Sequence, residues 1–506
     1  MLKTKLALAL PLALITLVGC SSSDTRYQPV EAPEVANVFE LDEYWSASTG
    51  GVGDYYSELT AAFDRSHIFV AGREGEVSAL DKTTGDRLWS IDLSDEPEND
   101  EKDSARLSGG VALSGSVLVV GSENGYVYAL NSGDGTLLWK YFLGAEVVAK
   151  PAFSASGNKL FVLDSQGNFT CFDVASGDKL WVTGDASLPL RLRAQANPLT
   201  VGDEYVLVGT STGKVNVLLQ SNGATVNQIN VGEAIGSNAL ERIADVSASP
   251  LILGNVLYAA AFSGGLVEYD FGTFNYLAKL GYQTSRDLGF DQDSIVLTAD
   301  DGSVTCINRE DNSQRWVNTQ LSYRNVTAPV VFGGYAAVGD YEGYLYLMDM
   351  ADGSIDYMIE ADSSGIYHQG QVEDGKLYVV ARDGTLMCFG FADQSKAQQA
   401  LSVEQSNDAL LANAAQGLTL NHPGVYNAGI YAPAAMTQEQ LEARRAAIKR
   451  AVAQQEAQMA AQRRAAREAA QARAEYEAQR KAAEEERRQR LSGFGIAPGL
   501  RADMDE

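Results

Sequence analysis

Cysteine and histidine are the residue types of this chain best suited to metal or redox chemistry, and their spacing does not favour either. Besides Cys20, the cysteines are Cys171, Cys306 and Cys388. No C-x-x-C pair occurs among them, although thiol metal sites and redox disulfides commonly show one. The histidines are His67, His368 and His422, scattered with no second ligand at helical or hairpin spacing. We therefore expect no metal site, no catalytic residue and no cofactor, and we expect the histidines to be surface or turn residues.

A repeated segment explains where three of the cysteines lie. The motif Gly75-Glu-Val-Ser-Ala79-Leu80-Asp81 has eight copies spaced 38 to 51 residues apart. The later copies begin at Gly125, Gly167, Gly213, Gly264, Gly302, Gly343 and Gly384. Gly85 and Trp89 follow Asp81 at four-residue steps, which gives the unit A-L-D-x-x-x-G-x-x-x-W. The three cysteines fill the position of Ala79 in other copies, so we expect small, buried and unpaired thiols in separate units.

The repeat predicts an all-β fold, an eight-bladed β-propeller of four-stranded blades. Each unit contains about four short alternating or β-branched runs separated by turn residues. Four strands at a period of about 45 residues are typical of propeller blades. The eighth copy lacks its fourth strand, whereas Phe39 to Trp45 has the pattern of an outer strand placed before the first unit. We expect this N-terminal strand to complete the eighth blade and close the ring.

The first residues predict export and lipidation. Two lysines precede an apolar run, residues 6–18, as in a signal peptide, and this run is too short to span a bilayer. Leu17-Val18-Gly19-Cys20 resembles the bacterial lipobox, which implies that Cys20 is lipidated, and Ser21 after it implies the outer membrane. We assign residues 1–19 to the signal peptide and 20–36 to the lipid anchor and a tether. The alternative is an ordinary signal peptide with a chance cysteine.

Charge and composition separate the C-terminal part from the acidic body. Residues 21–395 hold 22 basic and 52 acidic side chains, a net of −30, whereas residues 437–491 hold 13 and 9, a net of +4. The acidic body argues against binding of nucleic acid, which needs a basic face. We expect the propeller at 37–395, a flexible linker at 396–436, a long charged helix at 437–491 and a disordered tail at 492–506. A solvated single helix and a coiled coil remain alternatives for residues 437–491.

The repeat unit resembles the PQQ-type propeller repeat of quinoprotein dehydrogenases and their non-enzymatic relatives. Among these, the lipobox, the eight repeats and the segments 107–112 and 339–346 resemble the BamB lipoproteins of the outer-membrane β-barrel assembly machine. The resemblance implies a lipid-anchored, periplasm-facing scaffold of the outer membrane that uses no cofactor. It also implies binding to BamA and other subunits of the machine, and it leaves contact with unfolded outer-membrane proteins open.

Two loop segments are the candidate partner-binding site. Ser187-Leu-Pro-Leu-Arg191 and Glu241-Arg-Ile-Ala-Asp245-Val resemble family motifs that contact BamA, although Glu241 and Ser247 stand where the family has Asp. Each segment precedes the start of an innermost strand, marked by Pro198 and Pro250, so the loops of two adjacent blades should emerge on one face. The candidate residues, expected to form a patch with apolar anchors and a charged rim, are Leu188, Leu190, Arg191, Arg242 and Asp245. The alternative is that Leu188, Leu190 and Leu192 alternate along one half-buried strand.

Three functions are open at this point. The scaffold function depends on the lipobox, the closed propeller and the paired loops. A PQQ-dependent quinoprotein dehydrogenase would share the repeat, but should add a Ca²⁺ site and often adjacent cysteines or a C-x-x-C-H motif, and neither cysteine pattern occurs. A periplasmic propeller that binds a sugar or another envelope ligand is the third.

Overall fold

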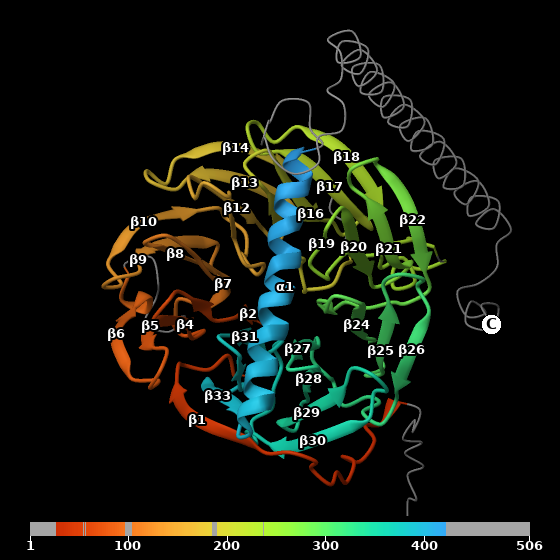
Figure 1. Cartoon of the computed structure of the whole chain (residues 1–506). Helices are drawn as coiled ribbons and strands as arrows, with labels where there is room; N and C mark the ends of the chain where they lie inside the picture. Colours follow the sequence, from red (N-terminus) through yellow and green to blue (C-terminus); the bar gives the residue numbers. More distant parts are fainter. Residues whose placement is uncertain are drawn as a thin grey trace, which may run out of the picture. The chain divides into compact units, whose positions relative to one another are not determined.

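A computed structural model describes residues 27–53, 55, 57–96, 104–184, 190–235 and 237–420, with the side chains of the last helix described as far as Ala412. Eight sheets, numbered here as blades one to eight along the chain, form a ring around a central axis (Figure 1). The predicted eight-bladed propeller is therefore confirmed. The proposed signal peptide, Cys20, residues 421–436 of the proposed linker, the helix predicted at 437–491 and the tail at 492–506 lie outside the described residues.

The strands occupy equivalent places in the blades, from the centre of the ring outward. The innermost strands of blades one to eight are β3 (Ala62–Phe63), β7 (Leu107–Ser114), β11 (Ala152–Phe153), β15 (Leu199–Val201), β19 (Leu251–Leu253), β23 (Gly289–Phe290), β27 (Val330–Phe332) and β31 (Gln371–Glu373). The second strands are β4 (His67–Ala71), β8 (Val117–Ser122), β12 (Lys159–Leu163), β16 (Tyr205–Gly209), β20 (Val256–Ala261), β24 (Ser294–Thr298), β28 (Tyr335–Gly339) and β32 (Lys376–Val380).

The outer half of each blade follows the same order. The third strands are β5 (Glu76–Asp81), β9 (Tyr126–Asn131), β13 (Asn168–Asp173), β17 (Lys214–Leu219), β21 (Gly265–Asp270), β25 (Val304–Asn308), β29 (Tyr344–Asp349) and β33 (Thr385–Phe391). The outermost strands are β6 (Arg87–Asp92), β10 (Leu137–Phe142), β14 (Lys179–Gly184), β18 (Thr225–Asn230), β22 (Asn275–Leu280), β26 (Gln314–Asn318), β30 (Ile355–Glu360) and β1 (Leu41–Ser48). A short 3₁₀ helix, η2 (Leu93–Asp95), follows β6.

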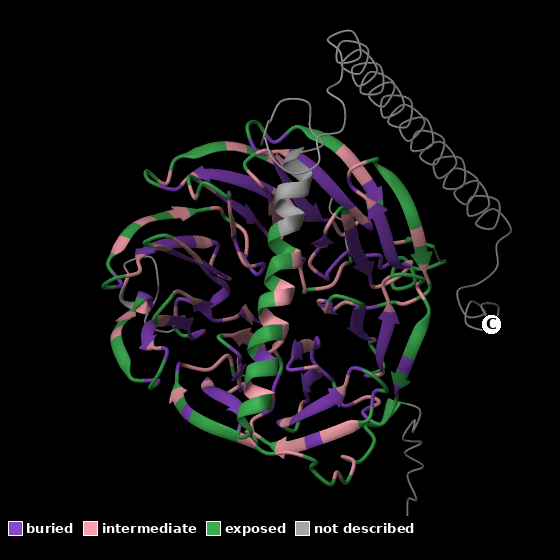
Figure 2. Ribbon diagram, viewed as in Figure 1, coloured by how far each residue is buried: buried purple, intermediate pink, exposed green. Residues whose placement is uncertain are grey.

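Burial explains the two sequence patterns of the strands. Second and third strands are covered on both faces by neighbouring blades, so β8 is buried along nearly its whole length and reads as a continuous apolar run. The outermost strand β10 alternates between half-buried and exposed residues, because blades diverge at the rim. Figure 2 shows this gradient from buried inner strands to exposed outer strands.

The N-terminal strand closes the ring. β1 pairs antiparallel with β33, with Trp45 opposite Cys388, and completes blade eight as predicted. The two ends of the propeller are thereby joined in one sheet. Seven sheets have four strands, and the sheet of blade two has a fifth, the short strand β2 (Glu58–Leu59), which pairs with β7. The preceding segment also lies against the ring, since the Val30 N–H donates to the Ser322 carbonyl at 3.1 Å.

In five of the eight blades, a tryptophan of the outermost strand packs against a glycine of the next blade. Trp139 pairs with Ala129 in its own blade, and its indole N–H donates to the Val174 carbonyl of blade three at 2.8 Å. Its ring also covers Gly177, where an added Cβ would lie 2.7 Å from the indole and where φ is +73°. Glycine is needed at this position both for its backbone conformation and for the close approach of the ring.

A helix replaces part of the predicted linker. Residues Gln394–Leu420 form α1, which crosses the ring from blades seven and eight (Figure 1). Ala400 is buried, Glu404 accepts the N–H groups of Asp374 and Gly375, and the Asn407 side-chain amide donates to the Phe290 carbonyl at 3.2 Å. The expectation of a flexible linker was wrong for these residues, because polar contacts and alanines hold a helix whose composition carries little apolar signal. No helix of the described chain is long and apolar enough to span a membrane.

Candidate functional site

The two candidate loops lie next to each other at one face of the propeller, called here the entry face because loops enter the innermost strands there. One loop connects β14 to β15, and β15 begins directly after Pro198. The other loop connects β18 to β19, and β19 begins directly after Pro250. Helix α1 contacts the opposite face, at turns such as Asp374-Gly375 between β31 and β32. Leu188 lies outside the described residues, whereas the other four candidate residues are described.

Leu190 and Arg191 are in an irregular loop. Residues 190–193 form no strand, so the alternative of a half-buried strand is wrong for the described part of this segment. The Leu190 side chain is 39% exposed, and Arg191 is half-buried. An apolar side chain and a guanidinium therefore stand side by side in the sequence, accessible to a partner at the entry face.

Asp245 is buried beneath this loop and holds it by a hydrogen bond. Its residue is only 4% exposed, and Oδ1 accepts the Leu192 N–H at 3.1 Å, which ties the two loops together. Oδ2 is buried without a hydrogen-bond partner in the described structure. Burial raises the pKa of Asp245 to about 6, although the Leu192 N–H and the nearby Arg191 charge oppose this shift. The expected charged rim is thus corrected, since Asp245 lies under the patch rather than at its edge.

Arg242 and Glu241 occupy an exposed turn of the second loop. The Arg242 N–H donates to the Ala239 carbonyl at 3.3 Å, and its side chain is exposed. Glu241 Oε2 accepts the backbone N–H of Ser237 at 2.6 Å and its hydroxyl at 2.9 Å. These bonds lower the pKa of Glu241. The glutamate therefore stabilises its own turn, and it can do so with a side chain one methylene longer than the family's Asp.

Ion pairs fasten the first loop to blades one to three. Arg193 contacts Glu123 at 2.6 Å and Glu146 at 3.4 Å, and Glu123 also contacts Arg73 at 2.7 Å. A groove of about 550 Å³ lies along this network and includes Arg191 in its wall. No sequence motif indicates this network, because its members come from separate repeats.

A second hollow, called here the channel cavity, lies at the centre of the ring on the entry face. Its volume is about 420 Å³, and its lining includes Gln195 of the first loop and Ser247 of the second. Ser247, one of the two departures from the family motif, is only 5% exposed and lines this cavity, and its hydroxyl has no partner within the described chain. The sequence comparison therefore placed Ser247 in the docking motif, but the structure places it in the channel wall.

The histidines and cysteines differ in how well they match expectation. His67 begins β4 and contacts Asp64 at 2.9 Å, whereas His368 lines the channel cavity instead of a surface turn. Burial lowers the pKa of His368 to about 4, so its ring is neutral near pH 7. The predicted small buried position of the cysteines is confirmed in blades three, six and eight, where the free thiols belong to Cys171, Cys306 and Cys388. His422 lies outside the described residues, and within them no group of three His, Cys, Asp or Glu is arranged to hold a metal ion.

Comparisons with known proteins agree on one family. The family model described as outer membrane protein assembly factor BamB matches residues 42–103 and 73–318. The proteins of that name from Shewanella oneidensis and Escherichia coli K12 are 36% and 32% identical over 75% and 76% of this chain, and over 96% and 98% of their own lengths. The crystal structure of BamB from Moraxella catarrhalis superposes with a TM-score of 0.62 at 26% identity, covering 70% of this chain and all of the other. A europium-containing methanol dehydrogenase, at 12% identity and a TM-score of 0.55, shares the fold alone.

Proposed function

Because this chain belongs to the family of outer membrane protein assembly factor BamB, we propose that it is a non-catalytic scaffold of the outer-membrane β-barrel assembly machine. In this function it binds BamA and other subunits while β-barrel proteins fold and insert into the outer membrane. The observation that carries the proposal is similarity over nearly the full length of the named relatives, 96% and 98% of two of them. Direct contact with unfolded outer-membrane proteins would be a further activity of the same scaffold.

BamA docks, in this proposal, on the patch formed by Leu190, Arg191 and Arg242, and Leu188 stays a further candidate contact. Leucine supplies apolar contact, and arginine is enriched at the centres of protein interfaces because it combines charge, planarity and a long apolar stem. Asp245 acts by fixing the Leu192 N–H, and so the shape of the loop. A buried carboxyl group with a raised pKa, kept at a cost to folding, supports a functional reason for its presence.

The protein is attached to the outer membrane through lipid on Cys20, with the propeller facing the periplasm. The net charge of −30 over residues 21–395 repels anionic lipid head groups, so the lipid is the main attachment. Labelled palmitate should enter the intact protein and not a Cys20→Ala variant, which should also leave the membrane fraction. A membrane-bound, unlabelled wild type would contradict the lipid anchor.

Affinity purification after mild crosslinking in cells tests the scaffold function. The full chain should recover BamA as its main partner, and the recovery should fall when Leu190 and Arg191 are both changed to Ala. Recovery of BamA at background level, from cells in which the chain is properly localised, would contradict the proposal. Saturable binding of PQQ in the presence of Ca²⁺ would favour the dehydrogenase alternative.

A further inference from the structure

The channel cavity at the entry face is built from single residues of several loops. Glu58 stands on β2 (Glu58–Leu59), a short strand that pairs in parallel with β7 and so lies inside the innermost strand of blade two. Gln195, Ser247, Asp287 and His368 come from the loops that enter blades four, five, six and eight. With about 420 Å³, the cavity falls in the size range of small-ligand sites, about 300–1,000 Å³.

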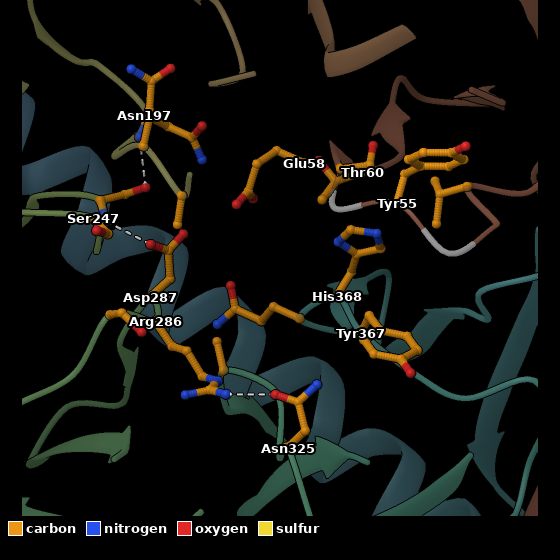
Figure 3. A pocket seen from close by; sticks show the side chains of 18 of the residues that line it. Tyr55, Glu58, Thr60, Asn197, Ser247, Arg286, Asp287, Asn325, Tyr367 and His368 are labelled. Carbon is orange, nitrogen blue, oxygen red and sulfur yellow. Dashed lines mark hydrogen bonds between the residues drawn. The ribbon is translucent and has the colours of Figure 1, made fainter. Parts of the chain in front are cut away.

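Three potential hydrogen-bond acceptors are buried in the wall of the cavity. Gln195 Oε1, Ser247 Oγ and His368 Nε2 have no hydrogen-bond partner among the described residues. The Gln195 oxygen can only accept, and the neutral imidazole and the hydroxyl can each accept as well. The carboxyl groups of Glu58 and Asp287 enter the cavity from opposite walls (Figure 3).

The cationic side chains around the cavity are directed to partners in its wall. Arg286 contacts Asp300 at 3.3 Å and donates to the Asn325 side-chain oxygen at 2.9 Å. Arg382 donates to the Tyr367 hydroxyl at 3.4 Å, and Lys150 Nζ donates to Thr60 Oγ1 at 3.4 Å. These three basic side chains thus make contacts within the wall. The carboxyl groups of Glu58 and Asp287 line the same cavity, and Asp287 Oδ1 also accepts the Ser249 N–H at 2.6 Å.

The electrostatics agree with this inventory. Burial, and then the charge of Asp287, raises the pKa of Glu58 to about 8, and burial raises the pKa of Asp287 itself. Burial also lowers the pKa of Lys150 to about 8, while His368 is neutral. A positive charge placed between the two carboxyl groups would be favoured, because it would replace the proton that Glu58 retains near pH 7.

We propose that this cavity binds a compact cationic group, a guanidinium or a primary ammonium, between Glu58 and Asp287. The cation donates hydrogen bonds to the carboxyl oxygens and to the acceptors of Gln195, Ser247 and His368. Two sources carry this chemistry, a basic side chain of a protein that docks at the entry face and a free small amine.

Calorimetric titration of the full chain tests the proposal with Nα-acetyl-arginine methylamide as the probe. Its neutral isostere, Nα-acetyl-citrulline methylamide, should bind at least tenfold more weakly. Affinity for the arginine probe should rise roughly tenfold from pH 7 to pH 9, as Glu58 and Lys150 lose their protons, and binding should release protons to the buffer. Spermidine, titrated in parallel, separates a free amine from a peptide-borne guanidinium as the preferred source.

Variants localise the binding. Glu58→Gln and Asp287→Asn should each weaken the arginine probe at least tenfold, and Glu58→Gln should reduce proton release. Gln has the shape of the protonated glutamic acid that prevails at neutral pH, so this variant should fold. Glu74→Gln removes an exposed acid from a turn of the same face and should change affinity less than twofold.

Three results would overturn the proposal. These are equal binding of the citrulline and arginine probes, full affinity in both cavity variants, and tight binding of Ca²⁺ in place of the organic cation. If Glu58→Gln does not fold, the Asp287→Asn variant and the citrulline comparison decide the question.

Discussion

Replacing Asp245 with Asn is expected to raise the stability of the propeller more at neutral than at acidic pH. The folded protein binds the Asp245 proton more tightly than the unfolded chain does, because burial raises the pKa from 3.8 to about 6. Stability therefore falls as pH rises through this interval, and the full penalty is present above pH 6. The penalty amounts to about 1.6 kcal/mol at pH 5 and about 3 kcal/mol at pH 7.5, a difference of about 1.4 kcal/mol.

Urea unfolding of the wild type and of Asp245→Asn at both pH values measures this difference. Any constant effect of the amide, including its own buried NH₂ group, cancels in the comparison. Measurement at pH 5 keeps the protein above its isoelectric point of about 4.5. Asp178→Asn, at an exposed turn, should change stability by less than about 0.5 kcal/mol at either pH. An effect of Asp245→Asn that is the same at both pH values, or larger at pH 5, would refute the reasoning.

Further predictions concern the repeat, the helix and the thiols. Gly177→Ala should lower the free energy of unfolding by about 2–4 kcal/mol, because the added methyl group clashes with the Trp139 ring and φ is +73°. Gly115→Ala, at φ +57° with open space around it, should lower it by only about 1–2 kcal/mol in chemical denaturation. Equal losses would show that the ring contact is unimportant. Truncation after residue 420 should leave the melting temperature within a few degrees, but truncation after residue 393 should lower it clearly, because it removes the buried contacts of α1; a tail-dependent melting temperature would contradict this. The three buried thiols should resist alkylation until the protein unfolds and then all react, as mass spectrometry can show, and a disulfide-linked pair would contradict the blade assignment.

The repeat allowed most of the fold to be predicted from sequence. The Trp, Gly and Ala-or-Cys positions recur because each blade presents similar surfaces to its neighbours. The same contact between blades therefore produces the same sequence pattern in several units. The missing fourth strand of the last copy likewise predicted the closure by β1. These inferences succeeded because a repeat converts tertiary contacts into a local pattern.

Features outside the repeat were missed for physical reasons. Helix α1 packs through Ala400, Glu404 and Asn407, so its contact face lacks the apolar periodicity by which helices are recognised. Strand β2 has only two residues, which is too short for an alternating pattern. The channel cavity is lined by one or a few residues from each of several loops, so no single loop contains a motif that predicts it.

Within the candidate site, sequence correctly placed the two loops beside each other but not the depth of their residues. Leu190 is exposed as expected of an anchor, whereas Asp245 is buried beneath the loop. Ser247, two residues further on, faces the channel. Depth depends on how the loops fold over the innermost strands, and the spacing of residues does not encode that.

Binding of the purified periplasmic part of BamA tests the central claim most directly. The double variant Leu190→Ala with Arg191→Ala should bind at least tenfold more weakly than the wild type, with a melting temperature that is nearly unchanged, because truncation of a central anchor typically costs about 2 kcal/mol or more. The matched control, Lys179→Ala with Leu180→Ala, removes a similar exposed pair from the outermost strand β14 and should bind like the wild type. Wild-type affinity in a folded Leu190 and Arg191 double variant would contradict the account and place the BamA contact elsewhere on the ring.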